Sequence, residues 1–254
     1  MLYRRSTRFL MAAVLALAFL PALAGELTVS AASSLTQAFR DMAQAYQTRY
    51  PEARVALNFG ASGALLQQIA RGAPVDVFAA ADQETMDQAE AQGLVLAGER
   101  RDFVRNTLVL ITAADSTLAL RRLEDLGQAT VTRIALGNPD SVPAGRYARR
   151  ALEAARLWPV LQAKVITTQN VRQSLDYVAR GEVDAGFVYG TDAALMKDKV
   201  KVVLEVPLDI AIRYPVAKIT ASPRGEEARR FMAYLASPAA LAILAHHGFG
   251  KLGP

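Results

Sequence analysis

The chain has 254 residues, of which 52% are hydrophobic and 21% charged, and its formal net charge is +5. It contains no cysteine, which excludes disulfides, thiolate metal sites and thiol nucleophiles. Subtracting Arg4, Arg5 and Arg8, which precede the mature region, from the 29 basic residues leaves 26 against 24 acidic ones, or +2, so the charge gives no basis for binding nucleic acid or an anionic membrane.

Residues 1–24 have the pattern of an export signal peptide. The three arginines precede an apolar stretch from Phe9 to Leu20, and Ala22-Leu23-Ala24 supplies a small-x-small cleavage site. A membrane anchor is the alternative, but the apolar stretch is shorter than the roughly 20 residues that a span needs. We therefore expect cleavage near Ala24 and a periplasmic location for the remaining 230 of the 254 residues.

Strand-like and helix-like segments alternate in the first part of the mature chain. Leu35, Phe39, Met42, Ala43 and Tyr46 recur at helical spacing directly after a strand-like run. The pattern predicts strands over 26–30, 54–59 and 75–80, and helices from 35 to 46, over 63–71 and over 83–92. This βαβα order predicts a mostly parallel sheet with helices on both of its faces.

A second series begins with the apolar run 107–112, which is suited to cross between two lobes. Strands are predicted over 133–136, 164–167, 183–189, 200–206 and 213–219, and helices over 146–158, 171–180, 224–236 and 238–247. The sequence shows no internal repeat and no long linker. The order of elements therefore predicts two α/β lobes joined by crossing strands, with residues 25–105 and 215–254 in the first lobe and 106–214 in the second.

Four junctions stand out because an extended run ends there in small or hydroxyl residues and a helix begins at once. They are 29–35, 59–64, 137–145 and 170–173, and none carries Lys, His or Cys. A helix start exposes unpaired N–H groups and the positive end of the peptide dipole, so several starts aimed at one point form an anion site. Ligands of open α/β sheets lie beyond the carboxyl ends of the strands, which places the expected site between the lobes.

The serine at the first junction has a structural explanation as well as a functional one. Ser34 opens a capping box with Gln37, in which the hydroxyl accepts from the first-turn amides. Ser33 beside it is redundant for capping. A pair of hydroxyls at a helix start is what an anion site would add, because a hydroxyl can turn its hydrogen toward an oxyanion.

Ser62, at the second junction, stands between Gly60 and Gly63. It is either the N-cap of a helix or part of a site where the glycines let the backbone approach a bound group closely. A hydrolase with Ser62 as nucleophile is disfavoured, because the G-x-S-x-G spacing is absent and the two histidines, 246 and 247, lie near the end of the chain.

The third and fourth junctions combine small residues with helix-start signals. Pro143 fits the first helical turn without losing a hydrogen bond, while Ala144 and Gly145 leave their amides uncovered. Asn170 is expected to cap the helix that begins at Val171.

Other residues are interpreted one by one. Tyr189 ends a strand, where its phenol is either part of the core or placed to donate into the cleft, and Asp82 is expected to be an N-cap. The arginine pairs at 100–101, 121–122 and 149–150 are interpreted as solvated faces, and no residue spacing suits a zinc or EF-hand site.

Taken together, these runs resemble the periplasmic molybdate-binding proteins of bacterial ABC importers, and the resemblance covers essentially the whole mature chain. The most specific match is Gly137-Asn138-Pro139-Asp140-Ser141-Val142-Pro143-Ala144-Gly145-Arg146-Tyr147-Ala148, together with Gly186-Phe187-Val188-Tyr189-Gly190-Thr191-Asp192-Ala193. The other matching runs are 31–36, 59–63, 72–78 and 170–172. The resemblance implies the two-lobed type II periplasmic-binding-protein fold, with each lobe a mostly parallel sheet flanked by helices and the ligand in the cleft.

The resemblance also implies a set of binding residues. By motif, a tetrahedral dianion would be held by Ser34, Ser62, Ala144, Val171 and Tyr189 through hydroxyls, backbone amides and the phenol. Around these would stand, as supporting residues, Ser33, Gly60, Gly63, Pro143, Gly145 and Asn170. The metal would be bound only as the oxoanion, without a direct protein ligand and without a separate cofactor.

Neutral donors suit molybdate, tungstate or sulfate, because these ions are fully deprotonated near neutral pH, whereas phosphate keeps a proton and needs an acceptor. The sequence thus predicts a monomeric, non-enzymatic carrier of molybdate or tungstate that delivers to a membrane permease. The alternatives are a binder of another small anion such as sulfate or an organic acid, and the Ser62 hydrolase. The sensor half of a transcription regulator shares the architecture but would need an N-terminal helix-turn-helix in place of the export signal.

Overall fold

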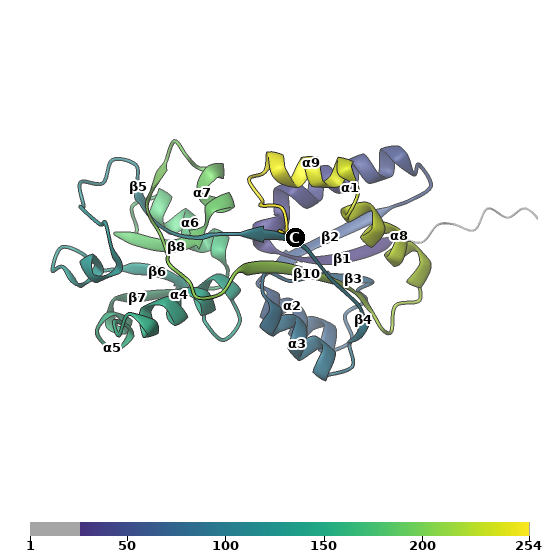
Figure 1. The fold of residues 1–254 in the computed structure, drawn as a ribbon, viewed down its shortest axis with the longest axis horizontal. Helices are drawn as coiled ribbons and strands as arrows, with labels where there is room; N and C mark the ends of the chain where they lie inside the picture. Colours follow the sequence, from purple (N-terminus) through teal and green to yellow (C-terminus); the bar gives the residue numbers. More distant parts are fainter. Residues whose placement is uncertain (1–25, 254) are drawn as a thin grey trace, which may run out of the picture.

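The computed structural model describes residues 26–253, so the predicted export signal over residues 1–24 lies outside the described residues. Two five-stranded sheets lie side by side, and each carries helices on both faces (Figure 1). Nowhere between residues 26 and 253 is there a helix with both the length and the apolarity needed to cross a membrane.

The two sheets have the same plan. The first has the order β2-β1-β3-β10-β4 and the second β7-β6-β8-β5-β9. In each, the first three strands are parallel, and the fourth, β10 or β5, is antiparallel to both of its neighbours. Four strands of five therefore point the same way, which confirms the prediction of mostly parallel sheets. The strands are β1 (Leu27–Ala32), β2 (Val55–Gly60), β3 (Val77–Ala79), β4 (Val95–Asn106), β5 (Leu108–Ala113), β6 (Ile134–Gly137), β7 (Val165–Thr168), β8 (Ala185–Tyr189), β9 (Val200–Glu205) and β10 (Ile212–Ile219).

The helices cover both faces of each sheet (Figure 1). In the first half these are α1 (Thr36–Arg49), α2 (Ser62–Ala70), α3 (Gln83–Ala91), α8 (Gly225–Leu235) and α9 (Pro238–His246). In the second half they are α4 (Pro143–Ala154), α5 (Trp158–Leu161), α6 (Val171–Ala179) and α7 (Gly190–Leu195), and the short 3-10 helices are η2 (Ser33–Leu35), η3 (Leu123–Gly127) and η4 (Gln162–Lys164).

Successive residues of β3 show how the first sheet is held between its helices. Val77 belongs to the core shared with Phe39 of α1 and Phe231 of α8, whereas Phe78 packs with Met86 of α3 on the opposite face. Alternate side chains of a strand point to opposite faces of the sheet, so a short apolar strand can supply both layers. A continuous apolar run of this kind is typical of parallel strands buried on both sides.

The chain passes twice between the two halves. β4 leads into β5 with Thr107 alone between them, and residues 206–211 connect β9 to β10. β10 pairs with β4 from Ile212 onward, in the first sheet. The division into lobes at residues 105/106 and 214/215 stays a prediction.

Three elements differ from the sequence-based prediction. β4 was not predicted, because the charged run Gly98-Glu99-Arg100-Arg101-Asp102 interrupts its apolar pattern, and the strand lies at the edge of the sheet with much of that run facing solvent. The single helix predicted over 146–158 is wrong: α4 begins at Pro143 and ends at Ala154, beyond which Arg156 takes a positive φ of 60° without the usual glycine, and α5 is separate. The short helix α7 was also not predicted.

Candidate functional site

The four junctions picked out in the sequence converge on one small cavity between the two halves of the molecule. The cavity has a volume of about 10 Å³. This is far below the roughly 300–1,000 Å³ of sites for drug-sized ligands and corresponds to about one small group. The lining residues are Ala32, Ser33, Ser34, Gly60, Ala61, Ser62, Ala81, Val142, Pro143, Ala144, Val171 and Tyr189.

The lining contains all five residues that the sequence predicts to bind the ligand. Of the six supporting residues, Ser33, Gly60 and Pro143 also line the cavity, whereas Gly63, Gly145 and Asn170 are not among its lining residues. Among the residues that the structure describes, none that lines the cavity carries a charge. The wall therefore offers hydroxyls, a phenol and the amides of helix starts to whatever enters.

Ser62 is the first residue of α2 and is not its N-cap, so the structural role considered for it is wrong. Ala61 occupies the N-cap position without a side-chain cap, and the Ser62 side chain is fully buried. The backbone N–H of Ala81 donates to Ser62 Oγ at 3.0 Å. Because Oγ accepts this bond, the hydroxyl hydrogen of Ser62 stays available to donate into the cavity.

The capping box predicted for Ser34 and Gln37 does not form. The helix start there has no side-chain cap, and Gln37 Oε1 is buried with no hydrogen-bond partner among the described residues. Ser34 Oγ instead lies 3.0 Å from the phenolic oxygen of Tyr214 on β10. This contact with Tyr214 takes the place of the predicted capping bond, so the Ser34 hydroxyl is not used to cap a helix.

Backbone amides line the cavity on the side of the second sheet. Helix α4 begins at Pro143 with Val142 as an N-cap that makes no side-chain cap bond, so the first amides of the helix are those of Ala144 and Gly145. A Cβ at Gly145 would overlap the carbonyl oxygen of Gly137, so this position needs glycine for α4 to approach the end of β6.

Helix α6 brings the amide of Val171 to the same cavity. Asn170 is its N-cap, as predicted, and Asn170 Oδ1 accepts from the backbone N–H of Gln173 at 3.1 Å. This cap satisfies the Gln173 amide in the first turn of α6, and Gln173 does not line the cavity. The predicted cap of α3 is also confirmed, because Asp82 Oδ1 accepts from the N–H of Thr85 at 3.3 Å.

Tyr189 ends β8 and is 1% exposed. Its phenolic oxygen lies 3.5 Å from the carbonyl oxygen of Ala81, at the limit of a hydrogen bond, and its ring meets that of Tyr214 edge to face at 5.7 Å. Burial raises the pKa of Tyr189 well above its ordinary value, so the phenol keeps its proton. The same holds for Tyr214, whose pKa burial also raises. Both phenols are therefore donors throughout the neutral range.

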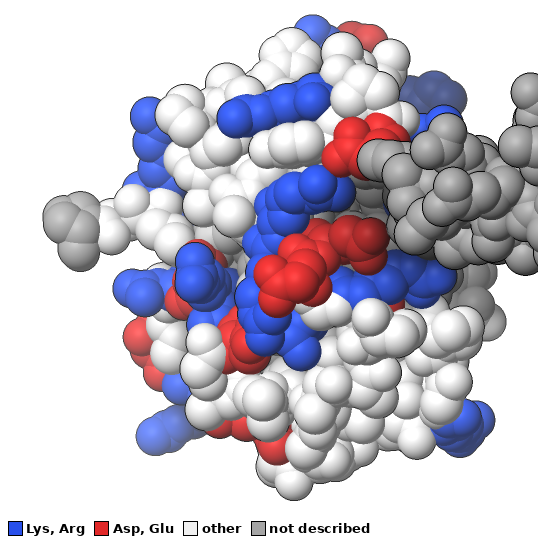
Figure 2. Space-filling model, turned by 90° about the vertical axis from the view of Figure 1, so that its right-hand side faces the viewer, with Lys and Arg blue, Asp and Glu red and all other residues white. Residues whose placement is uncertain are grey.

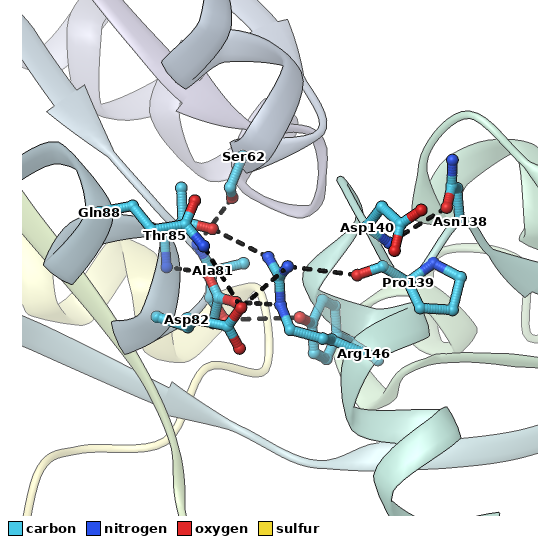
Figure 3. A network of polar contacts seen from close by, with 11 residues as sticks. Ser62, Ala81, Asp82, Thr85, Gln88, Asn138, Pro139, Asp140 and Arg146 are labelled. Carbon is cyan, nitrogen blue, oxygen red and sulfur yellow. Dashed lines mark hydrogen bonds and ion pairs between the residues drawn. The ribbon is translucent and has the colours of Figure 1, made fainter.

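Full charges lie outside the cavity, at a rim that we define as Asp82, Glu84, Thr85, Pro139 and Arg146. Figure 3 shows Asp82, Thr85, Pro139 and Arg146 of this rim. The Arg146 guanidinium, from α4, pairs with Asp82 at 3.0 Å and with Glu84 at 3.4 Å, and it donates to Thr85 Oγ1 at 3.1 Å. It also donates to the carbonyl oxygen of Pro139 at 3.2 Å in its own half. The rim ion pair Arg146–Asp82 thus joins the two halves of the molecule.

Two further contacts join the halves next to the cavity. The N–H of Gly63 donates to the carbonyl oxygen of Ser141 at 2.9 Å, and a Cβ at Gly63 would collide with the Ser141 backbone. Arg172 donates from Nη2 to the carbonyl oxygen of Ser34 at 3.2 Å and pairs through Nε with the buried Asp192 at 2.6 Å. Burial raises the pKa of Asp192, an effect that the Arg172 guanidinium opposes.

A wide groove lies outside the rim. It has a volume of about 800 Å³ and is bordered by charged side chains of α3 and α4, including Arg149, Arg150 and Glu153. Arg149 pairs with Glu153 at 2.7 Å.

Figure 2 views the end of the first half and shows basic and acidic side chains interleaved on that face rather than separated by sign. Arg229 illustrates this pattern, since it pairs with Glu99 at 2.9 Å and with Glu226 at 2.8 Å.

The arrangement does not provide the parts of a hydrolase around Ser62. His247 pairs with Asp41 of α1 at 2.7 Å, and neither histidine lines the cavity. A serine nucleophile needs a base within hydrogen-bond reach. Within residues 26–253, no cluster of three or more His, Cys, Asp or Glu side chains could hold a metal ion.

Sequence reasoning missed the roles of three residues at the site: Ala81, which lines the cavity, Tyr214, which contacts Ser34, and Arg146, which pairs with Asp82. These roles carry no local signal, because each depends on a contact distant in the sequence. The Ser34–Tyr214 contact spans 180 residues and the Arg146–Asp82 contact spans 64.

Comparison with known proteins places this geometry in a family. The family model described as "Bacterial extracellular solute-binding protein" matches residues 27–250. The molybdate-binding protein ModA of Escherichia coli (strain K12) is 35% identical over 231 residues, covering 89% of this chain and 89% of its own. ModA of Haemophilus influenzae is 33% identical over 238 residues, covering 92% and 93%. The solved structure of the Azotobacter vinelandii periplasmic molybdate-binding protein has the same fold, with a TM-score of 0.77 at 24% identity, and the match covers 90% of this chain and 99% of that one.

Proposed function

Because this chain belongs to the bacterial extracellular solute-binding protein family, we propose that it captures molybdate or tungstate in the periplasm and delivers it to the permease of an ABC transporter. The ligand lies in the cavity between the two halves and is held by Ser34, Ser62, Ala144, Val171 and Tyr189. The similarity to ModA over almost the whole chain supports this choice of ligand.

The observation that carries the proposal is the uncharged, donor-rich wall of a cavity of about 10 Å³. Molybdate, tungstate and sulfate only accept hydrogen bonds near neutral pH, so a wall of donors matches them. The hydroxyls of Ser34 and Ser62, the phenol of Tyr189 and the amides of helix starts supply about seven such donors. At about 1.5–3 kcal/mol for each bond to a charged group, they hold a dianion without a counter-ion, before ordering costs are subtracted.

The alternatives differ in size and in protonation. An organic acid carries a carbon skeleton as well as its carboxylate and therefore needs more room than a tetrahedral oxoanion. Phosphate keeps a proton that would meet donors only. Sulfate has the same shape and protonation as molybdate but is smaller, so the radius of the closed cavity is the property that separates the two. The protein acts as a monomeric carrier without catalysis and without a resident cofactor, and its hydrogen bonds release the ion when the two halves separate.

Calorimetric titration with molybdate, tungstate, sulfate and phosphate tests the proposal. We expect tight binding of the two metal oxoanions and no comparable binding of phosphate. Molybdate at 100 times its dissociation constant should add about 2.7 kcal/mol to the free energy of unfolding and raise the melting temperature. Phosphate binding as tight as molybdate binding, or no thermal shift with either metal oxoanion, would contradict the proposed function.

A further inference from the structure

A chain of hydrogen bonds runs from the first crossing between the two halves to Ser34. The backbone N–H of Thr107 donates to Asn106 Oδ1 at 2.9 Å. Asn106 Nδ2 donates to the phenolic oxygen of Tyr214 at 3.2 Å and to Thr191 Oγ1 at 2.9 Å. Tyr214 Oη in turn lies 3.0 Å from Ser34 Oγ. Asn106 ends β4, whereas Tyr214 lies on β10, so both crossing segments contribute to the chain.

The direction of each bond in this chain follows from its first member. A backbone N–H can only donate, so the side-chain atom of Asn106 that faces Thr107 is the oxygen, and the amide nitrogen faces Tyr214. Tyr214 accepts from this nitrogen and has one proton of its own. Among the described residues, Ser34 Oγ is the other hydrogen-bond partner of the phenolic oxygen, so we assign that proton to the bond with Ser34 Oγ. Ser34 then accepts from Tyr214, and its own hydroxyl proton remains for the cavity.

Burial keeps water from disturbing this order. The Tyr214 side chain has no solvent exposure and Ser34 is 3% exposed. Because burial raises the pKa of Tyr214, its phenol remains protonated. Ser62 reaches the same state by a different route, since its Oγ accepts from the N–H of Ala81. Ser34 and Ser62 are thus both held as donors, Ser62 by a backbone amide and Ser34 by two side chains.

We propose that Asn106 and Tyr214 are positioning residues that fix the Ser34 hydroxyl as a hydrogen-bond donor toward the cavity, which makes the site select fully deprotonated oxoanions over protonated ones. This inference rests on the proposed function. The two residues act through Ser34 and do not touch the ligand. A freely turning Ser34 hydroxyl could accept from a protonated anion, whereas one that already accepts from Tyr214 favours donation into the cavity.

Asn106→Asp tests the direction of the chain. The new carboxylate accepts from the Thr107 amide and draws the Tyr214 proton toward itself, so Tyr214 must accept from Ser34 and the Ser34 proton turns away from the cavity. We expect molybdate affinity to fall by about tenfold or more. The ratio of molybdate to hydrogen phosphate affinity should fall by a similar factor, because a lone pair now faces the anion. Thr107→Asp adds the same charge at the next position, where the side chain is exposed and takes no part in the chain of bonds, while the backbone N–H that does take part is kept. This variant controls for simple repulsion, which weakens the binding of both anions alike.

Tyr214→Phe, combined with Ser34→Ala, tests whether Tyr214 acts through Ser34. Alone, each variant should lower molybdate affinity, with Ser34→Ala costing about ten- to a hundredfold. In the Ser34→Ala background, Tyr214→Phe should cause no further loss. A merely structural role of Tyr214 would lower affinity in both backgrounds by the same factor. Melting curves without ligand verify that each variant folds, and the half-buried Asn106 offers the second test if Tyr214→Phe does not.

The outcomes separate the two proposals. A parent protein that binds none of the oxoanions would overturn the proposed function and this inference with it. A parent that binds molybdate selectively, with an unchanged anion ratio in Asn106→Asp and additive losses in the double variant, would overturn the inference alone. Loss of selectivity in Asn106→Asp but not in Thr107→Asp, together with a non-additive double variant, would support it.

Discussion

The cavity wall and the rim outside it lie within two residues of each other on both sides of the cleft, yet they differ completely in charge. Ala81 lines the cavity while Asp82 forms the rim ion pair, and Ala144 lines the cavity while Arg146 completes that pair. The charged side chains of this rim are therefore paired with each other, and a ligand in the cavity, as proposed, would meet only dipoles. When the halves separate and a dianion held by dipoles leaves, no charge in the site loses its partner. A buried counter-ion would lose its partner at that step, which costs free energy.

The largest effect should come from placing a charge in the cavity wall. Ser62→Asp puts a carboxylate where the dianion binds, so repulsion and desolvation should abolish molybdate binding in calorimetry. Ser62→Asn provides a control of equal size without the charge, and Thr117→Asp adds a charge at an exposed site. Retained binding in Ser62→Asp would show that the ligand site lies elsewhere.

The next effect concerns the backbone behind the wall. Gly145→Ala forces α4 away from Gly137, so we expect a loss of at least about 1–3 kcal/mol in the free energy of unfolding and weak or absent molybdate binding. Gly127→Ala is the matched control, because a Cβ there meets no atom within 4 Å. Chemical denaturation and calorimetry measure the two effects. Equal stability and affinity for both variants would mean that the close approach of α4 is not required.

Removing single donors tests the hydrogen bonds of the cavity wall separately from its charge, because the wall stays neutral. Ser62→Ala and Tyr189→Phe should each cost about 1.5–3 kcal/mol of molybdate binding, or roughly one to two decades in affinity, with the fold intact. Val171→Ala should change little, since Val171 acts through its amide. If both donor variants bind like the parent, these residues do not bind the ligand.

At the rim, the expected effect on affinity is smaller. Arg146→Met removes the cation that joins the halves and should weaken molybdate binding by about 1–2 kcal/mol, a factor of about 5–30, because the closed arrangement loses one of its contacts. Arg149→Met, on the same helix but paired within its own half, should leave affinity unchanged. A loss of all binding in Arg146→Met would move the ligand from the cavity to the rim.

The smallest effect should be that of pH. Burial raises the pKa of Tyr189 and of Tyr214, so both phenols stay protonated from about pH 6 to about pH 9, and the other ligand-binding groups do not titrate. Molybdate affinity measured by calorimetry across this range should therefore be flat. A steep change would indicate a titrating group at the ligand, such as a charged rim residue.

The sequence was sufficient to predict the architecture and most of the cavity wall, because both depend on local patterns, whereas Ala81 lies outside the recognised junctions and was missed. Strand ends followed at once by helix starts can be recognised in the sequence, and parallel sheets bring such junctions to one edge. The same approach failed for β4, where a charged run on the exposed edge of the sheet hides the alternation.

Local patterns could not assign the roles of the hydroxyls. Ser34-x-x-Gln37 has the spacing of a capping box, but the distant Tyr214 takes the Ser34 hydroxyl instead. Serine is a common N-cap residue, but Ser62 does not cap α2. Its Oγ instead accepts from the N–H of Ala81, in the turn after β3. Tertiary partners decide which of two locally plausible bonds a short polar side chain makes.

The location of the ligand can be tested most directly by a crystal structure of the molybdate complex with anomalous diffraction data at the molybdenum absorption edge. We expect one anomalous peak inside the cavity, with oxygens of the ion within hydrogen-bond distance of Ser34, Ser62 and Tyr189 and of the amides of Ala144 and Val171. A peak in the charged groove beside Arg146, with the cavity free of molybdenum, would contradict this expectation.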